Sequence, residues 1–138
     1  MTTVVVTGTF DGLHPGHEDL FRQAHEYGEH LVVIVGRDET VKMVKGRLPR
    51  QSENERLMAV KVHPLVQDAR LGGLGDKLAT IVEVNPDVLV LGYDQQAFTD
   101  GIEAKLAAQG AHPKIVRATA FHPERYKSSK LYENGGRE

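Results

Sequence analysis

Residues 4–17 read VVVTGTFDGLHPGH, and this stretch contains the signals for a strand, a turn and a helix in that order. The β-branched run at residues 4–6 predicts a short strand that is buried on both faces. Glycine, threonine and aspartate then interrupt the run with turn chemistry. Pro15 suits the first position of a helix, where its missing N–H costs nothing, and apolar residues recur at helical spacing over 20–27. The sequence therefore predicts a strand, a glycine-containing loop and a helix.

A helix that begins directly after a buried strand offers a site for phosphate. Its first turn carries free N–H groups and about half a positive charge, and open α/β sheets bind ligands at the carboxyl ends of their strands. His14 and His17 are three residues apart, so both side chains can point to one side of the first turn. Neutral imidazoles can donate hydrogen bonds to phosphate oxygens, and protonated ones would counter developing negative charge. The alternative is that the two histidines only cap the helix.

Residues 8–11 (GTFD) and 14–17 (HPGH) together resemble the signature of the HxGH nucleotidylyltransferases, which include cytidylyltransferases and adenylyltransferases of small molecules. The resemblance implies a Rossmann-like fold and transfer of a nucleotidyl group with release of pyrophosphate. It also implies that both histidines contact the triphosphate and stabilise the transition state at the α-phosphate. The nucleotide contacts implied in this stretch are Gly8, Thr9, Phe10, Asp11, His14 and His17.

Length and composition limit the class of protein. The 138 residues fit one domain, which we expect to span residues 1–133, followed by a polar tail at 134–138. A net charge of −2 gives no support to sequence-independent binding of nucleic acid. The absence of cysteine excludes disulfides and thiolate metal sites. No apolar run approaches the roughly 20 residues of a membrane span, and no signal peptide is visible, so we expect a cytoplasmic protein without membrane contacts.

Strand-like apolar runs alternate with helical patterns along the whole chain. Ser52 and Glu55 form a capping box at the start of one of these helices. The alternation predicts an α/β fold with an open, doubly wound parallel sheet of about five strands in the order 3-2-1-4-5, covered by helices on both faces. Further strands are expected at 31–36, 66–71, 88–92 and 114–117, and further helices at 52–61, 76–84, 98–108 and 128–131.

Residues 37–50 lack a sustained apolar period, and by themselves they predict a solvated loop. Residues 37–50 lie beside the loop at residues 8–14, which is called the phosphate loop below. This position favours a basic segment that closes over a triphosphate. The segment also resembles the one that brings a lysine onto the phosphates in glycerol-3-phosphate cytidylyltransferases. Lys45 is the better positional match and Lys42 the reserve, while Arg47 lies in the same phosphate or acceptor loop.

Arg56 and Asp11 each have two interpretations. A cation in the first turns of a helix opposes the helix dipole, so Arg56 is either a ligand or a plain surface arginine. The resemblance matches Arg56 to a helix arginine of the family and implies a catalytic role. Asp11 either contacts a metal or only shapes the turn. Mg²⁺ is expected to bridge triphosphate oxygens and to keep several waters, so a dedicated carboxylate cage is unnecessary.

Two later segments are expected to reach the same edge of the sheet. One follows the fourth strand, and the other, KSSKL at 127–131, is similar to the final motif of the cytidylyltransferases, whose hydroxyls contact the triphosphate at a helix start. The family's arginine before that motif has only Arg125 nearby, out of register. The nucleotide-binding residues predicted in these segments are Gly92, Tyr93, Asp94, Gln95, Ser128 and Ser129.

The acceptor is suggested by two short stretches, KGRLP at 45–49 and LGYDQ at 91–95. They look most like archaeal-type FAD synthases, which adenylate FMN with ATP. The nearest alternative is a cytidylyltransferase that uses CTP with glycerol 3-phosphate or a related alcohol or sugar phosphate. A non-catalytic nucleotide-binding module is a second alternative, and a dehydrogenase is disfavoured because the first loop lacks GxGxxG. Similarity to cytidylyltransferases suggests a homodimer.

Overall fold

Five parallel strands form one sheet in the computed structural model, which describes residues 1–73, 78–92 and 101–119. The order is β3-β2-β1-β4-β5, and every neighbouring pair is parallel. The predicted strand order is therefore confirmed. The strands are β1 (Thr3–Gly8), β2 (His30–Val35), β3 (Asp68–Leu71), β4 (Val88–Leu91) and β5 (Lys114–Arg117).

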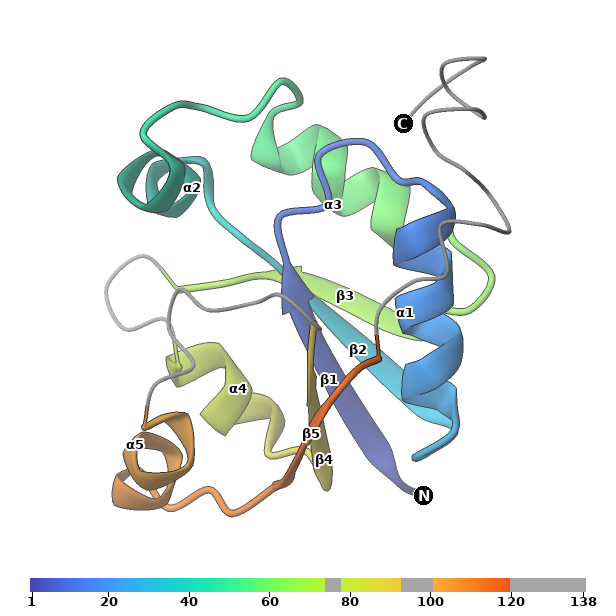
Figure 1. The fold of residues 1–138 in the computed structure, drawn as a ribbon, viewed down its shortest axis with the longest axis vertical. Coiled ribbons are helices and arrows are strands. Elements are labelled where there is room, and N and C mark those ends of the chain that lie inside the picture. Colours follow the sequence, from blue (N-terminus) through green and yellow to red (C-terminus); the bar gives the residue numbers. More distant parts are fainter. Residues whose placement is uncertain (74–77, 93–100, 120–138) are drawn as a thin grey trace.

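Helices cover both faces of this sheet, as Figure 1 shows. The helices are α1 (Pro15–His25), α2 (Asp38–Lys45), α3 (Glu53–Lys61), α4 (Ala79–Val84) and α5 (Ile102–Ala108). Apolar residues of α1 and α3 pack with Val4 and Val6 of β1, whereas those of α4 and α5 pack with Val5. Because successive side chains of a strand point to opposite faces, the run at 4–6 divides the core between two layers. The Rossmann-like three-layer arrangement is confirmed.

The segment at residues 38–45 corrects one expectation, because it forms the helix α2 rather than a solvated loop. Acidic residues occupy its first turn and lysines its last, which suits the helix dipole at both ends. Gly46 ends the helix in the left-handed region, with φ of 82°. Among its residues only Val41 is buried, so the sequence carries no apolar period by which the helix could be recognised.

Several predicted features fall on residues that the structure does not describe. These include the start of the helices expected at 76–84 and 98–108, the segment after β4, and the whole C-terminal part from 120 onward. The predicted nucleotide contacts Tyr93, Asp94, Gln95, Ser128 and Ser129, as well as Arg125 and the tail, lie outside the described residues. Within residues 1–73, 78–92 and 101–119, no helix has the length and apolar character needed to cross a membrane.

The capping box predicted at the start of α3 is present and gives a test of the local argument. Ser52 accepts a hydrogen bond from the Glu55 N–H, and the Glu55 carboxylate accepts one from the Ser52 N–H. We expect Ser52→Ala to lower the free energy of unfolding by about 1 kcal/mol, because an N–H of the first turn loses its acceptor. Urea denaturation would measure the loss. Ser52→Thr keeps the oxygen and should retain most of that stability; equal stability of the two variants would contradict the prediction.

Candidate active site

Two imidazoles cap the N-terminus of α1, at the carboxyl end of the central strand. Nδ1 of His14 accepts a hydrogen bond from the Gly16 N–H at 3.0 Å, and Nδ1 of His17 accepts one from the His14 N–H at 3.2 Å. This is a capping box in which histidines take the places that serine and glutamate usually occupy. The capping interpretation of the pair is therefore confirmed as a structural fact.

The same two bonds fix which nitrogen of each ring can reach a ligand. Because Nδ1 of each neutral ring is an acceptor, its proton is carried by Nε2, which remains a donor. The rings of His14 and His17 stack with centroids 3.8 Å apart and planes at 22°. Capping uses Nδ1 of each ring and phosphate binding would use Nε2, so the two interpretations are compatible.

Burial keeps this pair neutral. Desolvation, followed by the charge that His14 would carry when protonated and by the charge of Lys45, lowers the pKa of His17 from its ordinary 6.5 to about 3. Burial also lowers the pKa of His14. In the ligand-free protein the rings therefore act at neutral pH as uncharged donors, and the expectation that they counter charge as imidazolium ions receives no support from these surroundings.

Phe10 supports the His17 ring from inside the protein. Its backbone has a φ of 56°, which is rare for a bulky residue, and its side chain is buried at 3% exposure. The Phe10 ring meets the His17 ring edge-on, with centroids 5.1 Å apart. Gly8 makes room for it, because a Cβ at Gly8 would lie 2.8 Å from the tip of the Phe10 ring. The Phe10 side chain packs inward, so a nucleotide contact at this position falls to its backbone.

Asp11 joins the phosphate loop to the segment before α3. Its carboxylate accepts the N–H groups of Arg50 and Gln51 at 2.8 and 2.9 Å, and the Gln51 side chain accepts the Gly12 N–H in return. Burial acts to raise the pKa of Asp11, but the two hydrogen bonds and the charges of Arg50 and Arg56 outweigh it and lower that pKa. The turn-shaping role of Asp11 is thus present, and a metal contact stays a prediction. Gln51 was missed because nothing in its sequence surroundings marks it.

Arg56 is not a surface arginine, which corrects that interpretation of it, while its predicted catalytic role stays a prediction. Its side chain is 0% exposed and is the largest fully buried side chain among the described residues. The guanidinium donates to the carbonyls of Thr9, Gly36 and Gln51 and pairs with Asp38 at 2.7 Å. A buried cation needs such a set of partners, and here protein atoms supply it.

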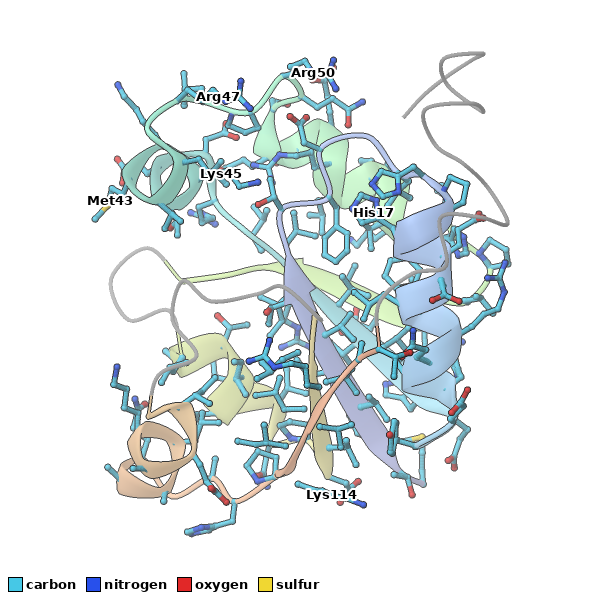
Figure 2. All side chains as sticks on the ribbon, viewed as in Figure 1. His17, Met43, Lys45, Arg47, Arg50 and Lys114 are labelled. Carbon is cyan, nitrogen blue, oxygen red and sulfur yellow. The ribbon has the colours of Figure 1, made fainter. Side chains whose placement is uncertain are left out.

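The predicted basic residues gather at the same end of the sheet as the histidines. Figure 2 shows Lys45 at the end of α2, with Arg47 and Arg50 along the connection from α2 to α3, in the half of the molecule where His17 lies. The charge of Lys45, and not that of Lys42, contributes to the lowered pKa of His17. This supports Lys45 as the lysine that faces the imidazoles. Arg47 is exposed.

The carboxyl end of β4 lies next to β1 in the sheet. Gly92 follows β4, and its carbonyl accepts a hydrogen bond from the Arg117 guanidinium at 2.7 Å.

A metal site built from protein ligands alone is not found in the described part of the chain, where no group of three or more histidine, aspartate or glutamate side chains could hold an ion.

The sequence profile of the cytidylyltransferase-like family matches residues 5–134. The chain belongs to this family. It is 39% identical over 130 residues to an FAD synthase of Methanocella paludicola, covering 94% of this chain and 92% of that protein. It is 37% identical over 131 residues to an FAD synthase of Thermoplasma volcanium, covering 95% and 92%. The resemblance that rested on residues 8–17 is thereby confirmed over nearly the whole chain, and the protein is a nucleotidyltransferase of the cytidylyltransferase-like family.

Solved structures show the same family fold. A crystal structure described as a lipopolysaccharide core biosynthesis protein of Thermoplasma volcanium superposes with a TM-score of 0.83 at 38% identity, covering 88% of this chain and 99% of that chain. A protein of unknown function from Archaeoglobus fulgidus superposes with a TM-score of 0.69 at 19% identity, over 86% of this chain and 90% of that chain, and supports the fold alone.

The lowered pKa of His17 predicts how stability changes with pH. The folded protein holds this ring neutral down to about pH 3, whereas the unfolded chain protonates it near its ordinary 6.5. The unfolded state therefore binds more protons below that value, and the contribution is lost as the pH falls. Between pH 6.5 and about pH 5 the loss should be about 2 kcal/mol.

Urea denaturation at both pH values would measure this loss against a matched variant. His17→Gln keeps an oxygen that can accept the His14 N–H but does not titrate, so its free energy of unfolding should fall less over the same range. An equal fall in both proteins would contradict the assignment.

Proposed function

We propose that the protein is an FAD synthase, which transfers the AMP group of ATP to the phosphate of FMN and releases pyrophosphate. The observation that carries the reaction type is the stacked pair of neutral imidazoles at the start of α1, with both Nε2–H groups left for a ligand. The choice of acceptor rests on the two FAD synthases to which the chain is similar over more than nine-tenths of its length.

This reaction asks the protein for position and charge rather than for covalent chemistry. A phosphate oxygen of the acceptor attacks the α-phosphorus of ATP, a new P–O bond forms, and the bond to the bridging oxygen breaks as pyrophosphate leaves. Catalysis then consists of holding the two phosphates in line and stabilising the negative charge that develops. His14 and His17 would donate hydrogen bonds to those oxygens, and one such donor is worth about 2.7–4 kcal/mol.

Positive charge would come from other groups. Lys45 stands close enough to His17 to lower its pKa and is exposed, so it is free to approach a triphosphate. Lys42 and Arg47 extend the same basic segment. The N–H groups of the first turn of α1 add the favourable end of the helix dipole. Gly8, Thr9 and Gly92, with the residues predicted at 93–95 and 128–129, complete the proposed nucleotide site.

Mg²⁺ fits this site as a cation bound to the phosphate groups of the nucleotide. We expect the ion to be held mainly by phosphate oxygens and water, with Asp11 as the candidate protein contact. Bound there, the ion would neutralise charge on the phosphates.

A homodimer is proposed from the similarity to cytidylyltransferases, and a cytoplasmic location is proposed from the sequence.

The second candidate is a cytidylyltransferase that uses CTP and glycerol 3-phosphate, and the family profile over residues 5–134 is the observation that favours it. Purified protein with Mg²⁺ would be offered ATP or CTP, each with FMN or glycerol 3-phosphate, while pyrophosphate and the products are followed. We expect FAD from ATP and FMN. CDP-glycerol from the other pair would replace the first proposal by the second, and no pyrophosphate from any pair would favour a nucleotide-binding module.

We expect His17→Ala to lower kcat by about 100- to 1,000-fold, because the reaction loses a positioned donor to the transition state. Stability should fall far less, by about 1 kcal/mol for the lost capping bond. Steady-state kinetics and urea denaturation would measure the two effects. His112→Ala is the matched control, since that exposed histidine lies beside α5 and should leave kcat unchanged. Near-wild-type turnover of His17→Ala would exclude the assigned role.

The two lysines of α2 give a second comparison. Lys45→Ala should lower kcat/KM for ATP well below that of Lys42→Ala, because Lys45 is the one whose charge reaches His17. Both substitutions remove one exposed lysine from the last turn of α2, so their cost in stability should be similar. Equal losses of kcat/KM in the two variants would contradict a special role of Lys45 and would show that the basic segment as a whole supplies the positive charge.

A further inference from the structure

We propose that Arg56 is a positioning residue, which sets the orientation of the His17 ring through the backbone of Thr9 and the side chain of Phe10. Its effect on catalysis rests on the proposed nucleotidyl transfer, but its effect on the histidines can be observed without any substrate.

The guanidinium of Arg56 links three separate segments of the chain, at residues 9, 36–38 and 51. Nη1 donates to the carbonyls of Thr9 and Gly36, both at 2.8 Å, and Nε donates to the Gln51 carbonyl at 3.1 Å. These carbonyls belong to the phosphate loop, the residue after β2 and the residue before the α3 cap. The rigid fork of the arginine side chain suits this set, because its donors diverge in one plane.

The bond to Thr9 lies directly before the strained residue of the loop. Phe10 has a φ of 56°, and such a conformation in a bulky residue persists only when its surroundings fix it. Arg56 fixes the carbonyl on one side of Phe10, and the Gly12 N–H closes a tight turn onto the Phe10 carbonyl on the other. Held in this way, the Phe10 ring stands 5.1 Å from the His17 ring and meets it edge-on.

The same guanidinium also holds the beginning of α2. Nη2 pairs with the Asp38 carboxylate at 2.7 Å, and the Asp38 N–H donates to Glu53 in the first turn of α3. The helix that carries Lys45 and the loop that carries the histidines therefore share one buried fixed point. Displacing it would move the imidazoles and the lysine relative to each other.

Substitution of Arg56 by lysine tests the proposal, because lysine keeps the charge but cannot supply the fork. In Arg56→Lys the ring signals of His14 and His17 should shift in NMR spectra of the nucleotide-free protein. kcat should fall about 100-fold, the size expected when reacting groups are misplaced by about 1 Å. The change in KM for ATP should be smaller than the change in kcat.

Arg70→Lys is the matched control. Arg70 pairs with Asp68 at 2.8 Å, a distance similar to that of the Arg56–Asp38 pair, but both of its side chains are about two-fifths exposed. It should leave the histidine signals and kcat as in the wild type. If Arg56→Lys does not fold, Asp38→Asn keeps the arginine and removes its countercharge, and the same shifts of the histidine signals are expected in it.

A measurement on the wild type separates positioning from ligand contact. The Nε–H signal of a buried arginine should be visible without nucleotide and should stay in place when Mg²⁺ and ATP are added. A shift of that signal on ATP binding, an unchanged kcat in folded Arg56→Lys, or unchanged histidine signals in both variants would each overturn the proposal. If the wild type makes no FAD while the histidine signals still shift in Arg56→Lys, the proposed function fails and the positioning role stands.

Discussion

Two backbone N–H groups at the start of α1 hold the Nδ1 atoms of His14 and His17, and the chemistry of the site depends on these two bonds. A capping box built from serine and glutamate would close the helix equally well but would offer at most the one serine O–H as a donor, because an ionised glutamate only accepts hydrogen bonds. With imidazoles in those places, the bond that closes the helix also chooses the tautomer that can donate to phosphate. Rotating either ring would leave an N–H of the first turn without its acceptor, at a cost of about 1 kcal/mol. In the proposed site the fold would therefore hold both donors in place before a nucleotide binds.

Because the two rings are neutral, the proposed site needs one kind of group to donate hydrogen bonds and another to supply positive charge. Burial and the nearby charge of Lys45 lower the pKa of His17 to about 3, so a positive charge on the ring is strongly disfavoured in the free protein. In the proposed site the positive charge is instead carried by exposed side chains on α2 and the segment after it, where water stabilises the cations and a triphosphate would replace that water. Under the proposed function the two imidazoles would supply directed hydrogen bonds and the exposed Lys45 would supply charge. The Phe10 ring contacts the His17 ring, and Arg56 binds the Thr9 carbonyl of the loop between them.

Local patterns in the sequence were sufficient for the strand order and for the position of the imidazole pair. The run at 4–6, the turn residues after it and Pro15 act within a few residues of one another, and each has a direct physical consequence. The capping box at Ser52 is local in the same sense. The helix at 38–45 was missed because only Val41 is buried, so its stability comes from charges at its ends and from anchoring by α3 rather than from an apolar face.

The contacts that could not be predicted join residues that are far apart in the chain. Asp11 and Gln51 are 40 residues apart, and Arg56 and Thr9 are 47 apart. The dipole argument correctly marked Arg56 as a cation in an unfavourable place, and it looked outward for a ligand that would compensate the charge. The compensation lies in the interior, where three carbonyls and one carboxylate meet the guanidinium. Which carbonyls a buried side chain reaches is decided by how β1, β2 and α3 pack together, and that packing is a property of the whole fold. An anomaly in local electrostatics thus identifies a residue that matters, while only the tertiary structure distinguishes a group that binds substrate from one that positions the groups that do.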